Sequence, residues 1–257
     1  MINLKIILAL SKQYHAVVSI VYNISAALEI FTLAVRREII DEKNTENLTI
    51  VMEKTTDNIG LILLAAGASK RLGKLKQLLH FSGETLLQRA VKTALASECR
   101  PLIIVLGANA EKLAREIEEF DVELVENTEW ENGMGTSIQI GIKHFSENYP
   151  NAAAVVLMVC DQPFVSVDLI EQLVRSFRRT NAPVTASSYG NTVGVPALFS
   201  RKLFPELMQL KADNGAKKII YEHRENVIKI PFEEGLIDVD TEQDYLNLMK
   251  SVKSDFE

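Results

Sequence analysis

The sequence predicts an α/β fold in three layers, with a mostly parallel β-sheet between two layers of helices. From residue 59 onward, short apolar runs alternate with segments of helical periodicity. The apolar runs are continuous, which is typical of parallel strands that are covered on both faces. The chain has 257 residues, of which 47% are hydrophobic, so it can bury a large core.

Each element is expected from its own local pattern. Apolar runs predict strands at 59–64, 102–106, 122–125 and 153–159, and further strands are expected at 183–188 and 227–230. Apolar residues at helical spacing predict helices at 84–97, 110–119, 136–147 and 167–179. A closing helix is expected over 240–252, where Thr241 is a cap or first-turn residue ahead of Glu242 and Asp244.

The first 57 residues differ from the rest of the chain. They read as a helix-like segment up to residue 40, followed by a polar linker at 41–49. We therefore divide the chain into an N-terminal extension and linker of unknown function, residues 1–57, and a main domain, residues 58–257. The extension is either an added helical segment or upstream sequence read into the gene, and every motif described below lies after it.

Composition and charge exclude several classes of protein. The net charge of −6 and a pI near 5.4 give no general affinity for nucleic acid. Two cysteines provide neither a disulfide framework nor a zinc site, which favours a reducing cytoplasm. No export signal is convincing, and no run of about 18 uncharged apolar residues predicts a membrane span. We expect a cytoplasmic protein without nucleic-acid or membrane partners.

The most informative segment is the loop that follows the first strand. It contains small residues and glycines, which let the backbone approach a ligand closely. Successive free N–H groups in such a loop form a concavity that binds anions, and Arg71 and Lys76 add positive charge. A triphosphate is the expected ligand. The candidate nucleotide-binding residues here are Leu64, Ala65, Ala66, Gly67, Ser69, Arg71, Gly73 and Lys76.

Two better-known phosphate loops do not match this segment. Gly67 and Gly73 are separated by five residues instead of the four of a Walker loop, and Leu75 stands where the hydroxyl residue is required. The Rossmann G-x-G-x-x-G pattern is also missing, because no glycine follows Gly67 two residues later. A basic, solvated connection without a ligand stays the alternative.

A carboxylate follows the apolar strand at 153–159. Asp161 lies at the end of this strand, where open α/β sheets bind ligands, and Pro163 ends the strand. A carboxylate opposite a phosphate loop is an expected Mg²⁺ ligand. The alternative is an aspartate that begins a turn before Pro163. Cys160 is expected to be a packed small hydrophobic residue.

Two more segments carry polar groups that point to a ligand. Asp238 and Asp240 share a face if their segment is extended, and they then need a cation or hydrogen-bond donors nearby. The alternative is that both are caps or surface residues. Earlier in the chain, Gly133 gives the backbone more conformational freedom just before a predicted helix. The first residues of this helix include Ser137, and the free N–H groups at its start suit a polar ligand.

Taken in order, these segments resemble the MobA-like nucleotidyltransferases. Residues 64–76 fit the signature L-A-A-G-x-S-x-R-x-G-x-x-K, and residues 127–137 fit N-x-x-W-x-x-G-M-x-x-S. The resemblance covers about residues 58–250 and is greatest to the molybdenum cofactor cytidylyltransferase branch. It implies a Rossmann-like nucleotidyltransferase fold. It also implies transfer of CMP from CTP to the phosphate of molybdopterin or molybdenum cofactor, with release of pyrophosphate and Mg²⁺ as the cofactor.

The resemblance also implies roles for single residues. Lys76, Arg71 and Asp161 become the catalytic residues, with Asp161 a metal ligand as in the family's C-D-Q-P segment. The family's D-[VI]-D-T segment supplies a second ligand, for which we favour Asp238 over Asp240. The expected acceptor-side residues are Gln162, Pro163, Pro196, Asp213 and Lys217, where Ala212 replaces the family's usual glycine.

Other functions stay open at this point. Ala66 accompanies cytidine in the family, whereas a glycine there accompanies guanosine, so a guanylyltransferase or another small-molecule phosphate nucleotidyltransferase is the alternative enzyme. The alternative that is not an enzyme is a chaperone module for a molybdoenzyme, which binds a nucleotide or cofactor without catalysis. A molybdoenzyme or its chaperone is therefore a possible partner in addition to the substrates.

Overall fold

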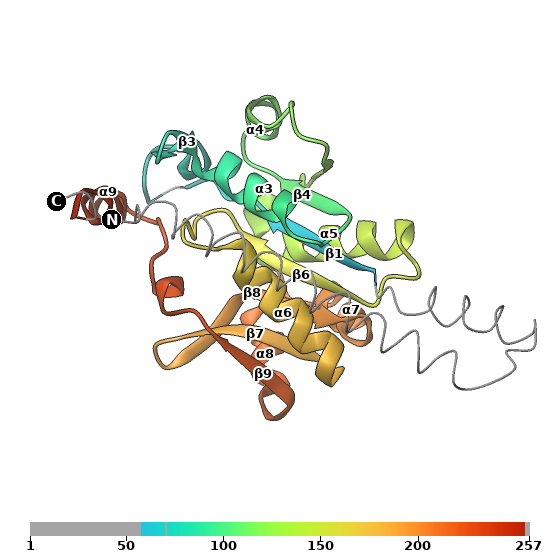
Figure 1. The fold of residues 1–257 in the computed structure, drawn as a ribbon. Coiled ribbons are helices and arrows are strands. Elements are labelled where there is room, and N and C mark those ends of the chain that lie inside the picture. The colour runs from blue at the N-terminus through green and yellow to red at the C-terminus, as the bar shows by residue number, and fades with distance from the viewer. Residues whose placement is uncertain (1–57, 70, 255–257) are drawn as a thin grey trace, which may run out of the picture. The chain divides into compact units, whose positions relative to one another are not determined.

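A seven-stranded sheet forms the centre of the part of the chain that the computed structural model describes, residues 58–69 and 71–254 (Figure 1). The predicted N-terminal extension lies outside the described residues. The strand order is β5-β4-β1-β6-β8-β7-β9. The strands are β1 (Ile59–Leu64), β4 (Leu102–Leu106), β5 (Glu123–Glu126), β6 (Ala154–Val159), β7 (Val184–Tyr189), β8 (Thr192–Ser200) and β9 (Val227–Pro231). A separate pair joins β2 (His80–Phe81) to β3 (Glu84–Thr85).

The sheet is mostly parallel, as predicted. Strands β5, β4, β1 and β6 run parallel, and β7 and β9 also run parallel to each other. Strand β8 is antiparallel to both of its neighbours, β6 and β7. The six strands predicted from apolar runs are all present, with ends that differ by one residue or none.

Helices cover both faces of the sheet (Figure 1). On one face, Leu61 and Leu63 of β1 share a buried cluster with α3, α4 and α6. On the other face, Ile62 and Leu64 share a cluster with α5, α7 and α8. Because successive side chains of β1 enter opposite clusters, its continuous apolar sequence is explained. The helices are α3 (Leu86–Ala96), α4 (Ala110–Glu116), α5 (Met134–Asn148), α6 (Val167–Thr180), α7 (Phe204–Met208), α8 (Lys217–Glu222) and α9 (Glu242–Ser254).

Strand β8 is the main element that the sequence did not predict. Gly194 and Pro196 lie inside it, and proline is normally confined to edge strands or bulges because it lacks an N–H group. Here the register between β7 and β8 shifts between Ala186 and Ser187, opposite this proline. The hydroxyl of Ser187 donates to the carbonyl of Pro196 at 2.7 Å. The bulge thus accommodates Pro196 within a central strand.

The C-terminal segment is fixed beside β2 and β3. Val239 and Leu248 form a buried cluster with Phe81 and Leu86. Thr241 caps α9, as expected from the sequence: its hydroxyl accepts from the N–H of Asp244 at 3.2 Å, and the Asp244 carboxylate accepts from the N–H of Thr241 at 2.7 Å. The segment 238–240 is therefore held between two ordered elements.

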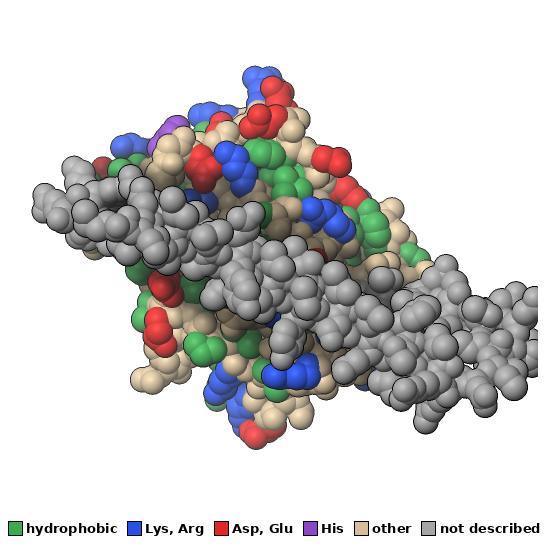
Figure 2. Space-filling model, viewed as in Figure 1, with side chains coloured by type: hydrophobic (Ala, Val, Ile, Leu, Met, Phe, Trp, Pro, Cys, Tyr) green, Lys and Arg blue, Asp and Glu red, His purple; other side chains and the backbone are tan. Residues whose placement is uncertain are grey.

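The described surface carries charges of both signs. On the face that Figure 2 displays, acidic and basic side chains are interspersed over the described residues. Within those residues, no helix is long and apolar enough to cross a membrane.

The contact between β1 and α5 gives a prediction about stability. A Cβ atom at Gly60 would lie 2.2 Å from Cε2 of Phe145, whose side chain is fully buried. We expect Gly60→Ala to lower the free energy of unfolding by about 1–3 kcal/mol through overpacking, as measured by urea denaturation. Phe145→Leu should relieve part of this clash in the double variant. Strictly additive effects of the two substitutions would contradict the contact.

Candidate functional site

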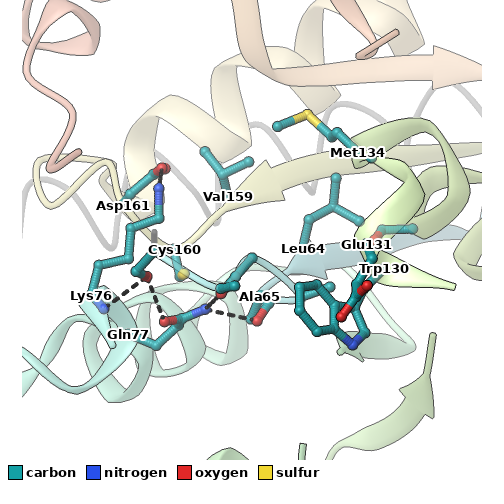
Figure 3. A pocket seen from close by; sticks show the side chains of 16 residues that line it. Leu64, Ala65, Lys76, Gln77, Trp130, Glu131, Met134, Val159, Cys160 and Asp161 are labelled. Atoms are coloured by element: carbon teal, nitrogen blue, oxygen red, sulfur yellow. Dashed lines mark hydrogen bonds and ion pairs between the residues drawn. The ribbon is translucent and has the colours of Figure 1, made fainter. Parts of the chain in front are cut away.

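A cavity of about 310 Å³ lies where β1 and β6 end at the same edge of the sheet (Figure 3). Leu64 pairs with Val159 in the sheet, so the loop after β1 and the segment after β6 begin side by side. This is the edge of an open α/β sheet at which ligands bind. The residues that line the cavity are 64–69, Lys76, Gln77, Trp130, Glu131, Gly133, Met134, Ser137 and 159–161.

Three successive carbonyl groups of the loop accept hydrogen bonds from other parts of the protein. The side-chain Nε2 of Gln77 donates to the carbonyl oxygens of Ala65 at 3.0 Å and Gly67 at 2.7 Å. Between them, the carbonyl of Ala66 accepts from the N–H of Ala108 at 3.1 Å. In a trans peptide the N–H points opposite to the preceding carbonyl. The N–H groups of residues 66, 67 and 68 are therefore turned away from these donors.

These loop N–H groups have no partner of their own. Among the residues that the structure describes, the N–H groups of Ala66, Gly67, Ala68 and Ser69 donate to no acceptor. Ala66 is only 6% exposed, so the lack of a partner is not made up by full exposure to water. Successive free N–H groups in a loop form an anion-binding concavity. The arrangement is what a phosphate group requires.

Ser69 closes the loop with an unusual backbone conformation. Its φ of 54° is in the left-handed region, and its carbonyl accepts from the N–H groups of Leu72 at 3.1 Å and Gly73 at 3.2 Å. Gly73 also has a positive φ of 69°, which suits a glycine. The Ser69 hydroxyl accepts from the N–H of Lys76 at 3.0 Å, so the loop is joined directly to the segment that carries Lys76.

Two cationic and two anionic side chains meet beside this loop. The Nζ atom of Lys76 lies 2.5 Å from Oδ2 of Asp161 and 2.9 Å from Oδ1 of Asp240. The other oxygen of Asp240 lies 2.5 Å from Nη2 of Arg71. Lys76 is largely buried, with 15% of its side chain exposed, whereas Arg71 is 71% exposed. Figure 3 shows Lys76 and Asp161 pointing toward each other at one end of the cavity.

The pairing has clear electrostatic consequences. Burial opposes the ammonium form of Lys76, but the charge of Asp161 and the hydrogen bonds to both carboxylates outweigh it and raise the pKa of Lys76. Burial likewise opposes ionisation of Asp240, but Lys76 and Arg71 lower its pKa. Burial and the neighbouring charge of Asp161 raise the pKa of Cys160 to about 12. Its thiol is therefore protonated at neutral pH and is not a nucleophile.

Asp161 and Asp240 form a carboxylate pair of the kind that Mg²⁺ uses. Both place an oxygen within 3 Å of one cationic atom, the Nζ of Lys76. Mg²⁺ commonly takes one or two carboxylates and fills its other positions with water and substrate phosphates. Within residues 58–69 and 71–254, no group of three or more His, Cys, Asp and Glu side chains is arranged to hold a metal alone. The pair fits such an ion only together with a phosphate ligand.

Asp238, the residue favoured from the sequence, is placed differently from Asp240. Within the described part of the chain it forms no ion pair with a Lys or Arg side chain. Burial and the charges of Asp240 and Asp161 raise the pKa of Asp238, so it lies within electrostatic reach of the pair. Its role as a metal ligand stays a prediction, and the geometry favours Asp240 for the position beside Asp161.

The opposite wall of the cavity comes from the segment before α5. Asn127 is buried, and its Nδ2 donates to the hydroxyls of Thr136 at 2.8 Å and Ser137 at 2.9 Å. Gly133 has a φ of 129°, and a Cβ atom there would lie 2.4 Å from the carbonyl of Ala212. Gly133 and Ser137 both line the cavity, next to Trp130 and Met134.

The expected acceptor-side residues do not line this cavity. The carbonyl of Pro163 accepts from Nε of Arg89 at 2.6 Å, and Pro196 lies in the bulge of β8. Asp213 lies against Gly133, and Lys217 lines a second cavity of about 610 Å³ beside β7, β8 and β9. Gln162 is buried, with its Nε2 on the carbonyl of Gly235 at 3.3 Å and its Oε1 without a partner among the described residues. Their roles stay predictions.

Two parts of the site were not found from the sequence. Gln77 follows Lys76 directly and precedes Leu78, and this position gave no signal that its side chain turns back to the loop. The contact of Asp240 with Lys76 was also missed, because a shared face on an extended segment does not distinguish Asp238 from Asp240.

Comparison with known proteins places this chain in a family. Residues 61–227 match the profile of the MobA-like NTP transferase domain. The nicotine blue oxidoreductase of Paenarthrobacter nicotinovorans is 37% identical over 119 residues, which are 46% of this chain and 56% of that protein. The chain thus spans just over half the length of this relative. The purine catabolism protein PucB of Bacillus subtilis is 27% identical over 199 residues, 72% of this chain and 92% of PucB.

Two further comparisons cover most of the main domain. The molybdenum cofactor cytidylyltransferase of Escherichia coli is 23% identical over 189 residues, 73% of this chain and 94% of the enzyme. The crystal structure of Rv0371c from Mycobacterium tuberculosis superposes with a TM-score of 0.64 at 30% identity, over 76% of this chain and 99% of that one. Since the family profile spans well over half of the residues, this chain belongs to the MobA-like NTP transferase domain family.

Proposed function

We propose that this protein transfers CMP from CTP to the terminal phosphate of a molybdopterin-type cofactor and releases pyrophosphate. The observation that carries nucleotidyl transfer is the row of N–H groups at residues 66–69, which have no acceptor among the described residues and belong to a loop that lines a cavity beside Lys76 and Asp161. An anion-binding loop next to a carboxylate pair suits a nucleoside triphosphate that binds together with a divalent cation.

The choice of nucleotide and acceptor rests on the relatives. One relative that spans 73% of this chain is named a molybdenum cofactor cytidylyltransferase. Ala66, which accompanies cytidine in the resembled branch, lies in the wall of the cavity. A divalent cation is supported by a further crystal structure of Rv0371c, at 27% identity, which is described as a complex with manganese.

The chemistry is an in-line displacement at the α-phosphorus of CTP. An oxygen of the acceptor phosphate attacks this phosphorus, the bond to the bridging oxygen breaks, and pyrophosphate leaves with the bonding electrons. The loop N–H groups and Arg71 hold the β- and γ-phosphates, and Lys76 neutralises charge on the α-phosphate. Because the acceptor phosphate is already ionised, no general base is needed.

The two carboxylates would hold the divalent cation. Asp161 and Asp240 supply one oxygen each, and the bound ion would neutralise charge on the phosphates and help to orient them. The ammonium of Lys76 lies within 3 Å of an oxygen of each carboxylate. Lys76 and the ion are therefore alternative partners for the same carboxylates, and a triphosphate is what draws Lys76 away.

The nucleotide preference is tested by pyrophosphate release. With Mg²⁺ and molybdenum cofactor, we expect CTP to be used faster than GTP, and neither to be hydrolysed without an acceptor. Discrimination at the scale of one methyl group is about 1–3 kcal/mol, roughly 10- to 200-fold in kcat/KM. If GTP were used as well as CTP, the guanylyltransferase alternative would replace cytidylyl transfer. If no acceptor phosphate supported turnover, the proposal that the protein is a nucleotidyltransferase would be contradicted.

The role of Asp161 is tested by Asp161→Asn. The amide keeps the volume but removes the negative charge, so we expect the turnover rate to fall about a hundredfold or more, with circular dichroism unchanged. Asp168→Asn is the matched control, because Asp168 lies exposed in the first turn of α6 and pairs with Arg175. Near wild-type turnover of Asp161→Asn, at unchanged metal dependence, would exclude Asp161 from the metal site.

Lys76 and Arg71 are expected to differ in kinetic effect. Lys76 lies deep in the site, so Lys76→Met should lower kcat strongly with a small change in the KM for CTP. Arg71 is mostly exposed, so Arg71→Ala should raise KM as well.

Lys76→Met also carries a second readout that needs no turnover. It should bind Mn²⁺ more tightly than the wild type in the absence of nucleotide, as measured by electron paramagnetic resonance. Unchanged Mn²⁺ affinity in Lys76→Met would show that Lys76 does not compete for the carboxylates. If Lys76→Met and Arg71→Ala changed only KM, and by equal factors, the proposal that the two residues have different roles would be contradicted.

A further inference from the structure

We propose that Gln77 is a positioning residue, whose side-chain amide orients the N–H groups of the phosphate loop toward the triphosphate. The inference rests on the proposed function, because it concerns the same loop. Gln77 has no exposed surface and lies in the short 3₁₀ turn Lys76–Leu78, outside the loop itself. It is one of the residues that line the cavity, and Figure 3 shows its side chain beside Ala65.

The hydrogen bonds of Gln77 use its whole amide group. Both N–H bonds of Nε2 are directed to loop carbonyls, those of Ala65 at 3.0 Å and Gly67 at 2.7 Å. The Oε1 atom accepts from the hydroxyl of Ser69 at 3.3 Å. One buried side chain thus contacts three of the five residues between Ala65 and Ser69. A buried amide with every polar atom paired fixes the geometry of what it contacts.

These contacts determine which way the loop peptides face. Every peptide from Ala65 to Ser69 is trans, so a carbonyl held on one side sends the following N–H to the other side. The hydrogen bond to the carbonyl of Ala65 therefore directs the N–H group of Ala66 away from Gln77. The hydrogen bond to the carbonyl of Gly67 likewise directs the N–H group of Ala68 away from Gln77. Those two N–H groups belong to the row for which residues 58–69 and 71–254 provide no acceptor.

Gln77 also joins the loop to the catalytic lysine. The Ser69 hydroxyl, which donates to Oε1 of Gln77, accepts from the backbone N–H of Lys76. The backbone of Lys76 is consequently fixed, and its side chain extends from a defined point toward Asp161. Loss of the amide would disturb the loop first and the position of Lys76 second.

Two substitutions separate positioning from simple support of the fold. Gln77→Met keeps the volume and removes every hydrogen bond, which leaves two loop carbonyls without donors. Gln77→Glu keeps an acceptor for Ser69 but places a carboxylate oxygen against those carbonyls. Gln88→Met is the matched control, because Gln88 also donates to a backbone carbonyl, that of Glu116 at 3.3 Å, and helps to cap α3 away from the cavity.

The measurements are CTP affinity by calorimetry, kcat and KM, and thermal melting. We expect Gln77→Met to weaken CTP binding at least tenfold, with a larger change in KM than in kcat, because two aligned N–H groups are lost. Gln88→Met should lower the melting temperature but leave CTP affinity within about twofold of the wild type. A Gln77→Met variant that binds CTP like the wild type would overturn the inference.

Gln77→Glu adds a readout that a structural role would not give. A protonated glutamic acid can again donate to one carbonyl, and burial raises the pKa of a carboxyl group. The ratio of the dissociation constants of the variant and the wild type should therefore fall between about pH 8 and about pH 6. If Gln77→Met does not fold, this series decides, and a constant ratio contradicts the inference. Wild-type protein that binds no nucleoside triphosphate would contradict the proposed function instead.

Discussion

The site depends on a row of backbone N–H groups that have no acceptor among the described residues. Residues 66–69 carry four such donors among the described residues, at the end of the central strand β1. Backbone donors that are removed from water without an acceptor are unfavourable, and most proteins avoid them. Here the carbonyls of residues 65–67 accept from Gln77 and Ala108, which fixes the orientation of the N–H groups that follow them. Ala66 is buried, so an anion that accepts from its N–H group removes this cost, whereas Gly67 is exposed.

The parallel sheet brings the opposite charges to the same place. Strands β1 and β6 are paired neighbours that end at the same edge of the sheet. The anion-binding loop after β1 and Asp161 after β6 therefore lie close together. The C-terminal segment reaches the same edge because Val239 is buried against Phe81 and Leu86. Asp240 therefore lies beside Asp161, although the two residues are far apart in the sequence. The ammonium of Lys76 pairs with both carboxylates and offsets their mutual repulsion.

Much of this arrangement could be predicted from the sequence, and the rest fails for physical reasons. Continuous apolar runs gave the buried strands, because only strands covered on both faces are apolar throughout. Strand β8 was not predicted because a proline is unusual in a central strand. Pro196 is accommodated there only by the bulge between β8 and its neighbouring strand β7. The loop was apparent from its small residues, but Gln77 was not, since a side chain that turns back to a loop leaves no periodic signal. Asp238 and Asp240 are chemically alike, and only the three-dimensional contact with Lys76 separates them.

The central claim is that the loop N–H groups bind the triphosphate opposite the carboxylate pair. A crystal structure of the protein with CTP and Mn²⁺ tests it most directly. The account predicts β- or γ-phosphate oxygens within hydrogen-bond distance of the N–H groups of residues 66–69, and Mn²⁺ on Asp161 and Asp240. It also predicts that Nζ of Lys76 has left those carboxylates for the α-phosphate. A triphosphate bound elsewhere, with Lys76 still between Asp161 and Asp240, would contradict the account.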